Sequence, residues 1–236
     1  MLTSNLNLVL PDKVDAERDR VAEAWIAHGG VVTRLGRFWD PPELEPRAVR
    51  IYANDTFALV LAQKLNLSLV SPEDDLLVKL PWSLVKREIT IRQLGESSAW
   101  SYPSFIKPVV PKQFRASAYD SATALAVETS GLDQHTLVYL SEVVVFTSEV
   151  RGFILAGTVQ DASLYEGESS LAEARSFLEV AARHESLPPT CVVDVGYIKG
   201  RGWAVIEANA AWGAGLNGCT ASKVLGCIAN ATRYAV

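Results

Sequence analysis

Asp194, Glu207 and Asn209 interrupt two apolar runs near the end of the sequence. A type II′ turn at Gly200-Arg201 would join these runs as a hairpin and place Asp194 opposite Glu207, with Asn209 on the same face. Facing carboxylates repel each other unless a cation lies between them. Because the three side chains offer only oxygen ligands, Mg²⁺ suits them better than zinc does. The alternative is an exposed strand face on which the acids occur by chance.

A second set of charged residues lies earlier in the chain. Glu142 opens an apolar run, Glu149 follows it, and Arg151 comes two residues later on the same strand face. Lys107 ends another apolar run, and a phosphate or carboxylate partner is expected there because buried lysines are seldom unpaired. An ordinary hairpin with a Glu/Arg pair near its end is the alternative for the glutamates.

These residues need strands to position them, and the N-terminal part of the sequence predicts a parallel sheet. Apolar runs alternate there with segments of helical spacing, which favours a small Rossmann-like lobe. The expected strands are 6–10, 31–35, 49–53 and 67–70, and the expected helices are 14–28 and 55–66. Ser71-Pro72-Glu73-Asp74 has the residue types of a further helix start.

Beyond Pro81 the pattern changes to that of an α+β protein. A strand is expected at 104–107, and helices at 82–94, 120–129, 169–184 and 220–233. Two antiparallel hairpins are expected, one from runs 137–146 and 150–159 that meet at Thr147-Ser148, and one from 191–198 and 203–209. The chain would then divide into lobes at 1–80, 81–140 and 141–236.

Composition excludes several classes of function. Lys and Arg number 22 against 27 Asp and Glu, and no basic block occurs, so nucleic-acid binding is not expected. The apolar runs are too short for a membrane span, and the N-terminus lacks the basic segment of a signal peptide, so a cytoplasmic protein is expected. The three cysteines have no metal-ligand spacing. A homodimer is left open. Gly213–Gly218 matches a dinucleotide-binding pattern, but no βαβ unit surrounds it.

Taken in order, the motifs resemble those of the ATP-grasp superfamily. They are Ile106-Lys107-Pro108, Ser141-Glu142-x-x-Val145, Glu149-x-Arg151, Asp194 and Glu207-x-Asn209. The segments around Lys107-x-x-x-x-Lys112 and Glu207-x-Asn209-x-x-Trp212-Gly213 look most like the small subgroup named for one arginine and two lysines. The resemblance implies an ATP-grasp fold, in which an N-terminal Rossmann-like lobe precedes two α+β lobes that sandwich the nucleotide.

The resemblance also implies ATP and Mg²⁺ as cofactors, and a role for each matching residue. The metal ligands would be Asp194, Glu207 and Asn209. Arg151 would approach the γ-phosphate or an acyl-phosphate, and with Lys107 and Lys112 it forms the expected catalytic set. The nucleotide would be bound by Lys107 at the α- and β-phosphates, Glu142 at the adenine amino group, the backbone of Val143 and Val145 beside the adenine, and Glu149 at the ribose hydroxyls.

The sequence departs from the family pattern in two places. Many relatives have a Gly-rich loop over the phosphates, whereas segment 109–119 contains Lys112 and Arg115 but no glycine. We expect these two cations to close over the triphosphate as a mobile cover. Many relatives also have an arginine at the position of Val192. Arg87 is therefore a further candidate for phosphate binding, or else a solvated helix residue.

The activity that the resemblance implies is ATP-dependent ligation of a carboxylate to an amine through an acyl-phosphate, with release of ADP and phosphate. The partner of ATP would be an amino acid, a peptide or another small molecule. It is expected to enter at Asn54-Asp55-Thr56, where a helix N-cap is the alternative role. Two other functions stay open, a kinase-like phosphoryl transferase of the same fold and a nucleotide-binding module without turnover.

Overall fold

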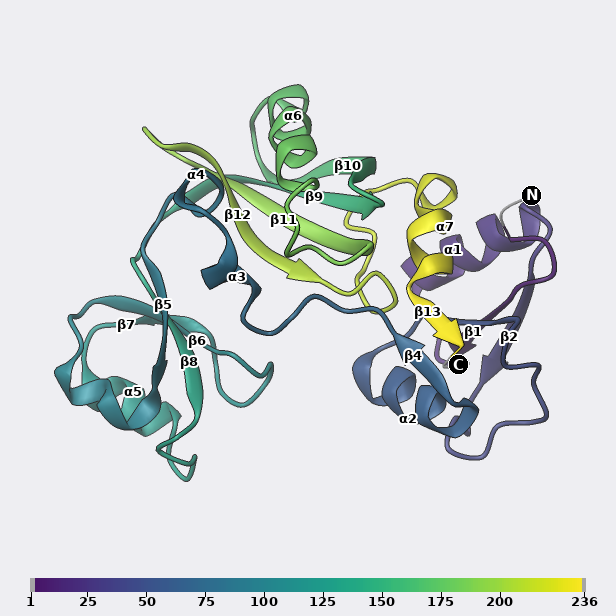
Figure 1. Cartoon of the computed structure of the whole chain (residues 1–236), viewed down its shortest axis with the longest axis horizontal. Coiled ribbons are helices and arrows are strands. Elements are labelled where there is room, and N and C mark those ends of the chain that lie inside the picture. Colours follow the sequence, from purple (N-terminus) through teal and green to yellow (C-terminus); the bar gives the residue numbers. More distant parts are fainter. Residues whose placement is uncertain (1–2, 235–236) are drawn as a thin grey trace. The chain divides into compact units, whose positions relative to one another are not determined.

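The computed structural model describes residues 3–234. They fold into two compact units, and each unit is made of segments that are far apart in the sequence. Unit 1 comprises the chain up to Pro72, the segment Ser148–Gly196 and the chain from Val205 onward. Unit 2 comprises Glu73–Thr147 and Tyr197–Ala204, the second of which is the tip of a hairpin whose strands otherwise belong to unit 1 (Figure 1).

Unit 1 begins with a parallel sheet whose strand order is β2-β1-β3. The expected alternation of strand and helix is confirmed, and Leu8 lies between Val32 and Arg50 of the neighbouring strands. Side-chain oxygens of Asp15 and Asn54 accept hydrogen bonds from backbone N–H groups at the starts of the two helices, which fixes where the helices begin. The elements are β1 (Asn7–Pro11), α1 (Ala16–Ala27), β2 (Val31–Leu35), β3 (Val49–Ile51) and α2 (Asp55–Leu65).

The fourth expected strand, β4 (Leu67–Leu69), forms but lies outside the parallel sheet. It pairs antiparallel with β13 (Thr232–Tyr234), because the closing helix α7 (Ala221–Asn230) ends earlier than expected. The helix start predicted at Ser71 is wrong. The Ser71 hydroxyl caps no helix, and its oxygen accepts a hydrogen bond from Trp212 Nε1 at 3.1 Å.

An antiparallel sheet with the order β10-β9-β11-β12 forms the second layer of unit 1. The hairpin predicted at Thr147-Ser148 is wrong, because both residues lie within one long strand. The chain instead turns at Ala156-Gly157, which both have positive φ (48° and 74°), as a type I′ turn requires. The elements are β9 (Phe146–Leu155), β10 (Thr158–Gly167), α6 (Leu171–Ala181), β11 (Thr190–Ile198) and β12 (Gly202–Asn209).

The hairpin of β11 and β12 is confirmed, but its turn differs from the expected one. The N–H of Arg201 donates to the carbonyl of Ile198 at 2.9 Å, so Gly200 is the third residue of a four-residue turn. Its φ of 80° is the conformation that glycine adopts at this position. The type II′ turn with Gly200 at its first central position is therefore wrong.

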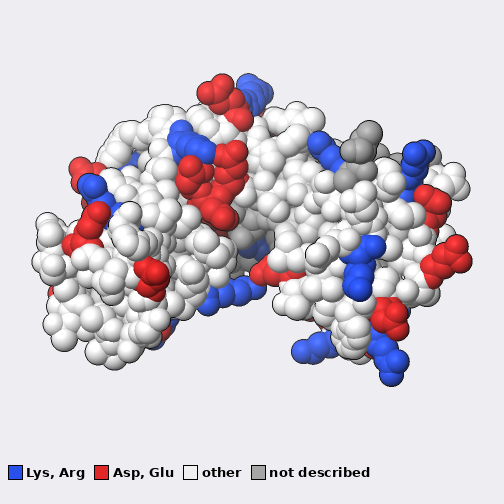
Figure 2. All heavy atoms as spheres, turned by 60° about the horizontal axis from the view of Figure 1, so that its bottom comes forward, with Lys and Arg blue, Asp and Glu red and all other residues white. Residues whose placement is uncertain are grey.

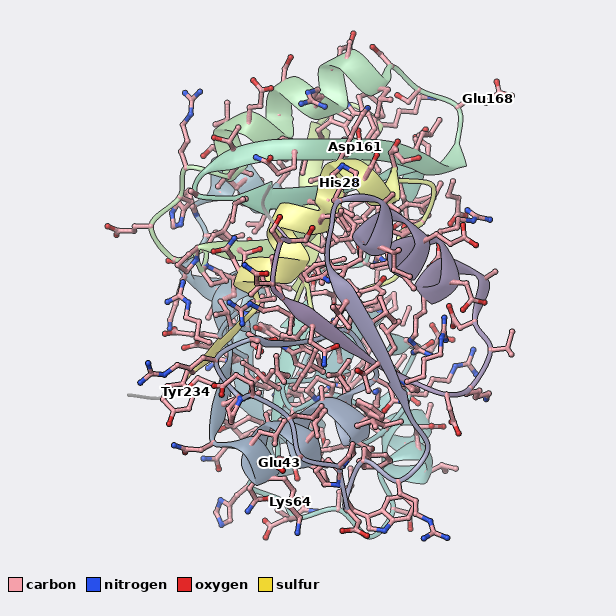
Figure 3. The ribbon with its side chains drawn as sticks, turned by 90° about the vertical axis from the view of Figure 1, so that its right-hand side faces the viewer. His28, Glu43, Lys64, Asp161, Glu168 and Tyr234 are labelled. Atoms are coloured by element: carbon pink, nitrogen blue, oxygen red, sulfur yellow. The ribbon has the colours of Figure 1, made fainter. Side chains whose placement is uncertain are left out.

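The core of unit 1 lies where α7 contacts α1, β3 and β10. Trp25, Phe153 and Ile228 are fully buried in it, and each such side chain stabilises the fold by about 1.5–3 kcal/mol. Asp161 of β10 fixes the start of α7, since its carboxylate accepts from the N–H of Thr220 at 2.7 Å and from Lys223 Nζ at 3.1 Å (Figure 3). This contact joins the antiparallel sheet to the helix that covers the parallel one.

Unit 2 contains an antiparallel sheet with the order β5-β8-β6-β7 and its own core around Ile106 and Leu125. The helix predicted at 82–94 is wrong beyond Val85, because Lys86 has a positive φ of 50° and Ile89–Gln93 forms an edge strand with alternating exposure. The elements are α3 (Leu76–Lys79), α4 (Trp82–Val85), β5 (Ile89–Gln93), a 3₁₀ helix (Leu94–Ala99), β6 (Ser104–Pro108), β7 (Ser117–Tyr119), α5 (Ala122–Glu128) and β8 (Leu137–Ser141).

Two surface features bear on function. None of the helices within residues 3–234 is long and apolar enough to cross a membrane. On the face shown in Figure 2, Lys and Arg side chains are interspersed with Asp and Glu, so that face carries no extended basic patch.

Candidate functional site

A buried ion pair joins two neighbouring strands of unit 1. Arg151 of β9 donates from Nε to Asp194 Oδ1 at 2.8 Å and from Nη2 to Oδ2 at 2.7 Å, and the two side chains are only 11% and 4% exposed. Burial disfavours the charge of Arg151, but the bonds and charge of Asp194 outweigh it, so the pKa of Arg151 is raised above its usual value. The cation expected beside Asp194 is thus supplied by the chain itself.

The β11–β12 hairpin brings the three expected metal ligands into one hydrogen-bonded group. Asn209 Nδ2 donates to Glu207 Oε1 at 3.0 Å and lies 3.5 Å from Asp194 Oδ2. Glu207 and Asn209 share a face because they are two residues apart on β12. Asp194 reaches them from the adjacent strand.

The donor chemistry of this group fits Mg²⁺. All three side chains offer oxygen, and the amide of Asn209 uses its nitrogen for the two contacts above, which leaves its oxygen for a cation. An ionised carboxylate has about four acceptor positions, so the ion pair of Asp194 does not exclude a metal. Throughout the described part of the chain, no three His, Cys, Asp or Glu side chains gather closely enough to hold a metal, so Asn209 is essential to such a site.

The loop that follows β12 is fixed to this group from two sides. Arg151 Nη1 donates to the carbonyl of Gly215 at 2.9 Å. Glu17, from the first turn of α1, accepts from the N–H groups of Leu216 and Asn217, both at 2.9 Å. A Cβ at Gly215 would lie 2.5 Å from Glu17 Oε2, so only glycine fits there. Sequence reasoning missed Glu17, because nothing in the sequence connects it to a loop almost 200 residues later.

Glu149 lies on β9 near Arg151 and accepts a hydrogen bond from the hydroxyl of Tyr165 at 2.6 Å. Burial and the bond to Glu149 both raise the pKa of Tyr165 above its usual value, so the phenol stays protonated and donates. The carboxylate expected at the ribose is therefore held in one orientation. Tyr165 is a second residue that the sequence did not indicate.

Unit 2 carries the lysines expected at the phosphates. Lys107 lies on β6 beside Tyr139 of β8 and is half-buried. Lys112 and Arg115 are exposed in the turn segment that follows, and Lys112 has a positive φ of 69°. This segment is shorter than 109–119, because its last three residues form β7. The structure thus places one expected lysine on a strand and the other two cations on a surface loop.

Glu142 is paired with an arginine that sequence reasoning missed. Arg201, at the hairpin tip, donates from Nη1 to Oε2 of Glu142 at 2.8 Å and from Nη2 to Oε1 at 2.6 Å, and it also donates to the Lys86 carbonyl. The hydrogen bonds from Arg201 hold the pKa of Glu142 below its usual value. A lone pair of this carboxylate can still accept from an amino group.

Around Glu142 the chain is extended and exposes apolar side chains. Val143 and Val145, between β8 and β9, are 40% and 73% exposed. Arg87 is buried and lies in no helix, so the alternative of a solvated helix residue is wrong. Its guanidinium lies 5.4 Å from the centre of the Phe146 ring, and burial lowers its pKa to about 10.

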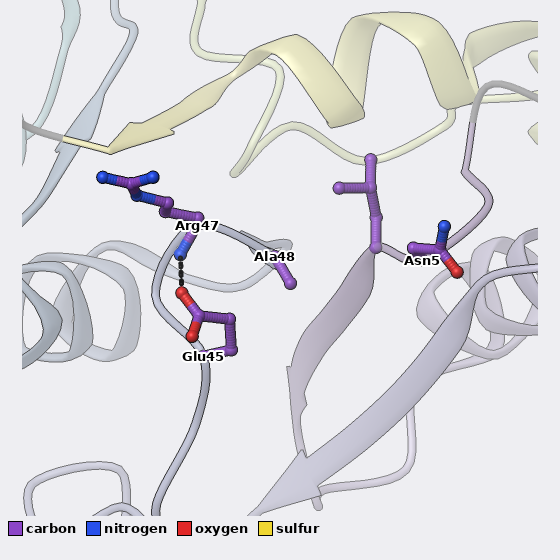
Figure 4. Close-up of a pocket in the computed structure, with 5 residues that line it drawn as sticks. Asn5, Glu45, Arg47 and Ala48 are labelled. Carbon is purple, nitrogen blue, oxygen red and sulfur yellow. Dashed lines mark hydrogen bonds between the residues drawn. The ribbon is translucent and has the colours of Figure 1, made fainter.

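The pocket drawn in Figure 4 lies elsewhere, at the amino ends of β1 and β3. Ligands of parallel sheets bind at the carboxyl ends of the strands, so its position does not favour a role in function. None of the residues singled out from the sequence lines it. Its lining residues are Asn5, Leu6, Glu45, Arg47 and Ala48.

A family model that describes an ATP-grasp domain, the second family of its clade, matches residues 84–227. The matched segment is more than half of the chain. No curated protein matches the chain significantly in sequence.

Solved structures of ATP-grasp proteins share the fold. A RimK domain ATP-grasp protein from Sphaerobacter thermophilus is 17% identical with a TM-score of 0.60, over 95% of this chain and 98% of that one. D-cycloserine synthetase DcsG is 13% identical with a TM-score of 0.58, over 95% and 99%. The ATP-grasp ligase PsnB, in complex with a variant of its minimal precursor, Mg and ADP, is 13% identical with a TM-score of 0.51, over 87% and 88%. At these identities the likeness establishes the ATP-grasp fold.

Proposed function

The chain belongs to an ATP-grasp domain family, and we propose from this that it is an ATP-dependent ligase. ATP would phosphorylate a carboxylate, an amine would attack the acyl-phosphate, and ADP and phosphate would be released. The observation that carries the proposal is the buried group Arg151, Asp194, Glu207 and Asn209, whose charges and oxygen ligands suit phosphoryl transfer.

Within unit 1, Asp194, Glu207 and Asn209 would hold Mg²⁺, and the bound ion would neutralise charge on the phosphates. Arg151 keeps a fixed orientation because Asp194 and Gly215 accept three of its five N–H donors. The remaining donors would bind the transferred phosphoryl group or the acyl-phosphate. Glu149, oriented by Tyr165, would accept from the ribose hydroxyls.

Within unit 2, Glu142 would accept from the adenine amino group, and the exposed backbone at Val143 and Val145 would lie along the adenine edge. Lys107 would contact the α- and β-phosphates. Lys112 and Arg115 would cover the triphosphate and exclude water, which protects an acyl-phosphate from hydrolysis. We assign Lys107, Lys112 and Arg151 as the two lysines and one arginine after which the subgroup is named. Arg87 would add positive charge near Glu142.

Two of the structural relatives support ligation over other phosphoryl transfers. One is named a synthetase, and the other is a ligase solved with a peptide precursor. A carboxylate and an amine on an amino acid or a peptide are therefore the substrates that we propose for this chain.

The test is ADP release with Mg·ATP and a panel of amino acids and short peptides, supplied singly and in pairs. A ligase releases ADP only when both a carboxylate and an amine are present, with a mass that matches condensation. A phosphoryl transferase needs one acceptor and yields a stable phosphorylated product. ADP release that no member of the panel stimulates would contradict the proposal.

A further inference from the structure

Arg18, in the first turn of α1, has a guanidinium with unused donors. Its side chain is only 20% exposed, and its nearest charged partner is Asp15, with 3.6 Å between Nη1 and Oδ2. That distance is too long for a hydrogen bond. In the described part of the chain no oxygen accepts a hydrogen bond from the Arg18 guanidinium. Its five N–H donors are thus available at a position where a long side chain is largely packed.

The acidic groups near Arg18 are engaged with other donors. Asp15 Oδ1 accepts from the N–H groups of Glu17 and Arg18 at the helix start. Glu17 uses both carboxylate oxygens to hold the loop after β12, and Asp194 is paired with Arg151. Arg18 is therefore a cation whose local counter-charges already have partners. An incoming anion would not have to displace a short ion pair.

The position of Arg18 is the ligand edge of the parallel sheet. It follows β1, and Tyr52 follows β3 at the same carboxyl edge. Tyr52 donates to the carbonyl of Ala214 at 2.8 Å, and the charges of Arg18 and Arg151 both act on its hydroxyl. The backbone N–H of Ala53 donates to the carbonyl of Trp212 at 2.9 Å. The loop bound by Arg151 therefore lies against the edge on which Arg18 stands, within one unit.

We propose that Arg18 binds a carboxylate group of the substrate at this edge, which makes the substrate an anionic molecule such as an amino acid or a dicarboxylate. The planar fork of guanidinium N–H donors matches the two oxygens of a carboxylate. This inference rests on the proposed function, since it names the class of substrate that the ligase would take. It assigns to Arg18 a binding role separate from that of Arg151.

The test is binding of succinate, acetate and inorganic phosphate to the full chain without ATP, followed by isothermal titration and by NMR of the arginine Nε–H groups. Arg18→Gln removes the charge, and Arg18→Lys keeps the charge but loses the fork. Arg20→Gln is the matched control, because Arg20 is exposed on the same helix. Thermal unfolding of each variant shows whether the fold is kept.

We expect Arg18→Gln to weaken succinate binding about tenfold or more, Arg18→Lys to restore part of it, and Arg20→Gln to leave it unchanged. The inference is overturned if succinate fails to bind, if Arg18→Gln binds as the wild type does, or if phosphate binds more tightly than either carboxylate. Because ATP is absent, the result is independent of turnover. A protein that binds succinate through Arg18 but never releases ADP would refute the proposed ligase alone.

Discussion

Replacing Arg151 with Met should destabilise the protein strongly, because it leaves the carboxylate of Asp194 buried without its partner. The two side chains are 11% and 4% exposed, so solvent cannot replace the lost interaction. Breaking a buried pair by removing one partner costs about 3–5 kcal/mol. For a chain of this length each kcal/mol lowers Tm by about 2–4 °C, so the expected fall in Tm is about 6–20 °C.

A double-mutant cycle measured by urea denaturation isolates the pair. Asp194→Asn removes the carboxylate charge, and Arg151→Met with Asp194→Asn removes both charges. The double variant should be more stable than the sum of the single effects predicts, by about 1–3 kcal/mol. Arg175→Met, which breaks a pair with Glu179 that is 41% and 48% exposed, is the control and should cost less than about 1 kcal/mol. Additive single effects, or a loss no larger than that of the control, would refute the reasoning.

Three further predictions concern the nucleotide residues. Arg201 lowers the pKa of Glu142, so their pair stabilises the fold at neutral pH and loses this effect as pH falls through that lowered pKa; unfolding curves of Arg201→Gln and wild type should differ at pH 7 and converge in acid, and a constant difference would count against the pair. Glu149→Ala should reduce the preference for ATP over 2′-deoxy-ATP, and an unchanged ratio of Kd values would disprove the ribose role. Lys112→Ala should lower turnover more than ATP affinity, and Mg·ATP should protect segment 109–119 from limited proteolysis; cleavage that nucleotide does not slow would rule out a phosphate cover.

The elements that sequence could predict are those set by local patterns. The parallel strands and their helices follow from alternating apolar periodicity, and Asp15 and Asn54 start helices as capping residues do. The hairpin that carries Asp194 and Glu207 was predictable because two apolar runs flank a glycine-containing turn.

The errors arose where a weaker local signal competed with the true one. Ala156-Gly157 is the real turn after β9, but alanine is unusual in the left-handed region, so Thr147-Ser148 seemed the better break. Ile89–Gln93 contains apolar residues that also fit helical spacing, and its pairing with β8 decided the outcome.

The partners of the candidate residues could not be predicted, because they depend on contacts between distant segments. Arg151 reaches Asp194 only because β9 and β11 are neighbours, although 43 residues separate them in sequence. Glu142 meets Arg201 across 59 residues. A like-charge pattern in the sequence indicated that a cation was needed, but it could not distinguish a metal from a guanidinium.

The most direct test of the proposed nucleotide site is the binding of ATP measured by calorimetry with Mg²⁺ and with chelator, for the wild type and for Glu207→Gln. Glu207→Gln keeps the side-chain shape and the acceptor for Asn209 but removes a negative charge. We predict that ATP binds the wild type much more tightly with Mg²⁺ than without it, and that the variant loses this metal dependence while its Tm is kept. Equal ATP affinity with and without Mg²⁺, or unchanged metal dependence in the variant, would contradict the assignment of Asp194, Glu207 and Asn209 to the metal.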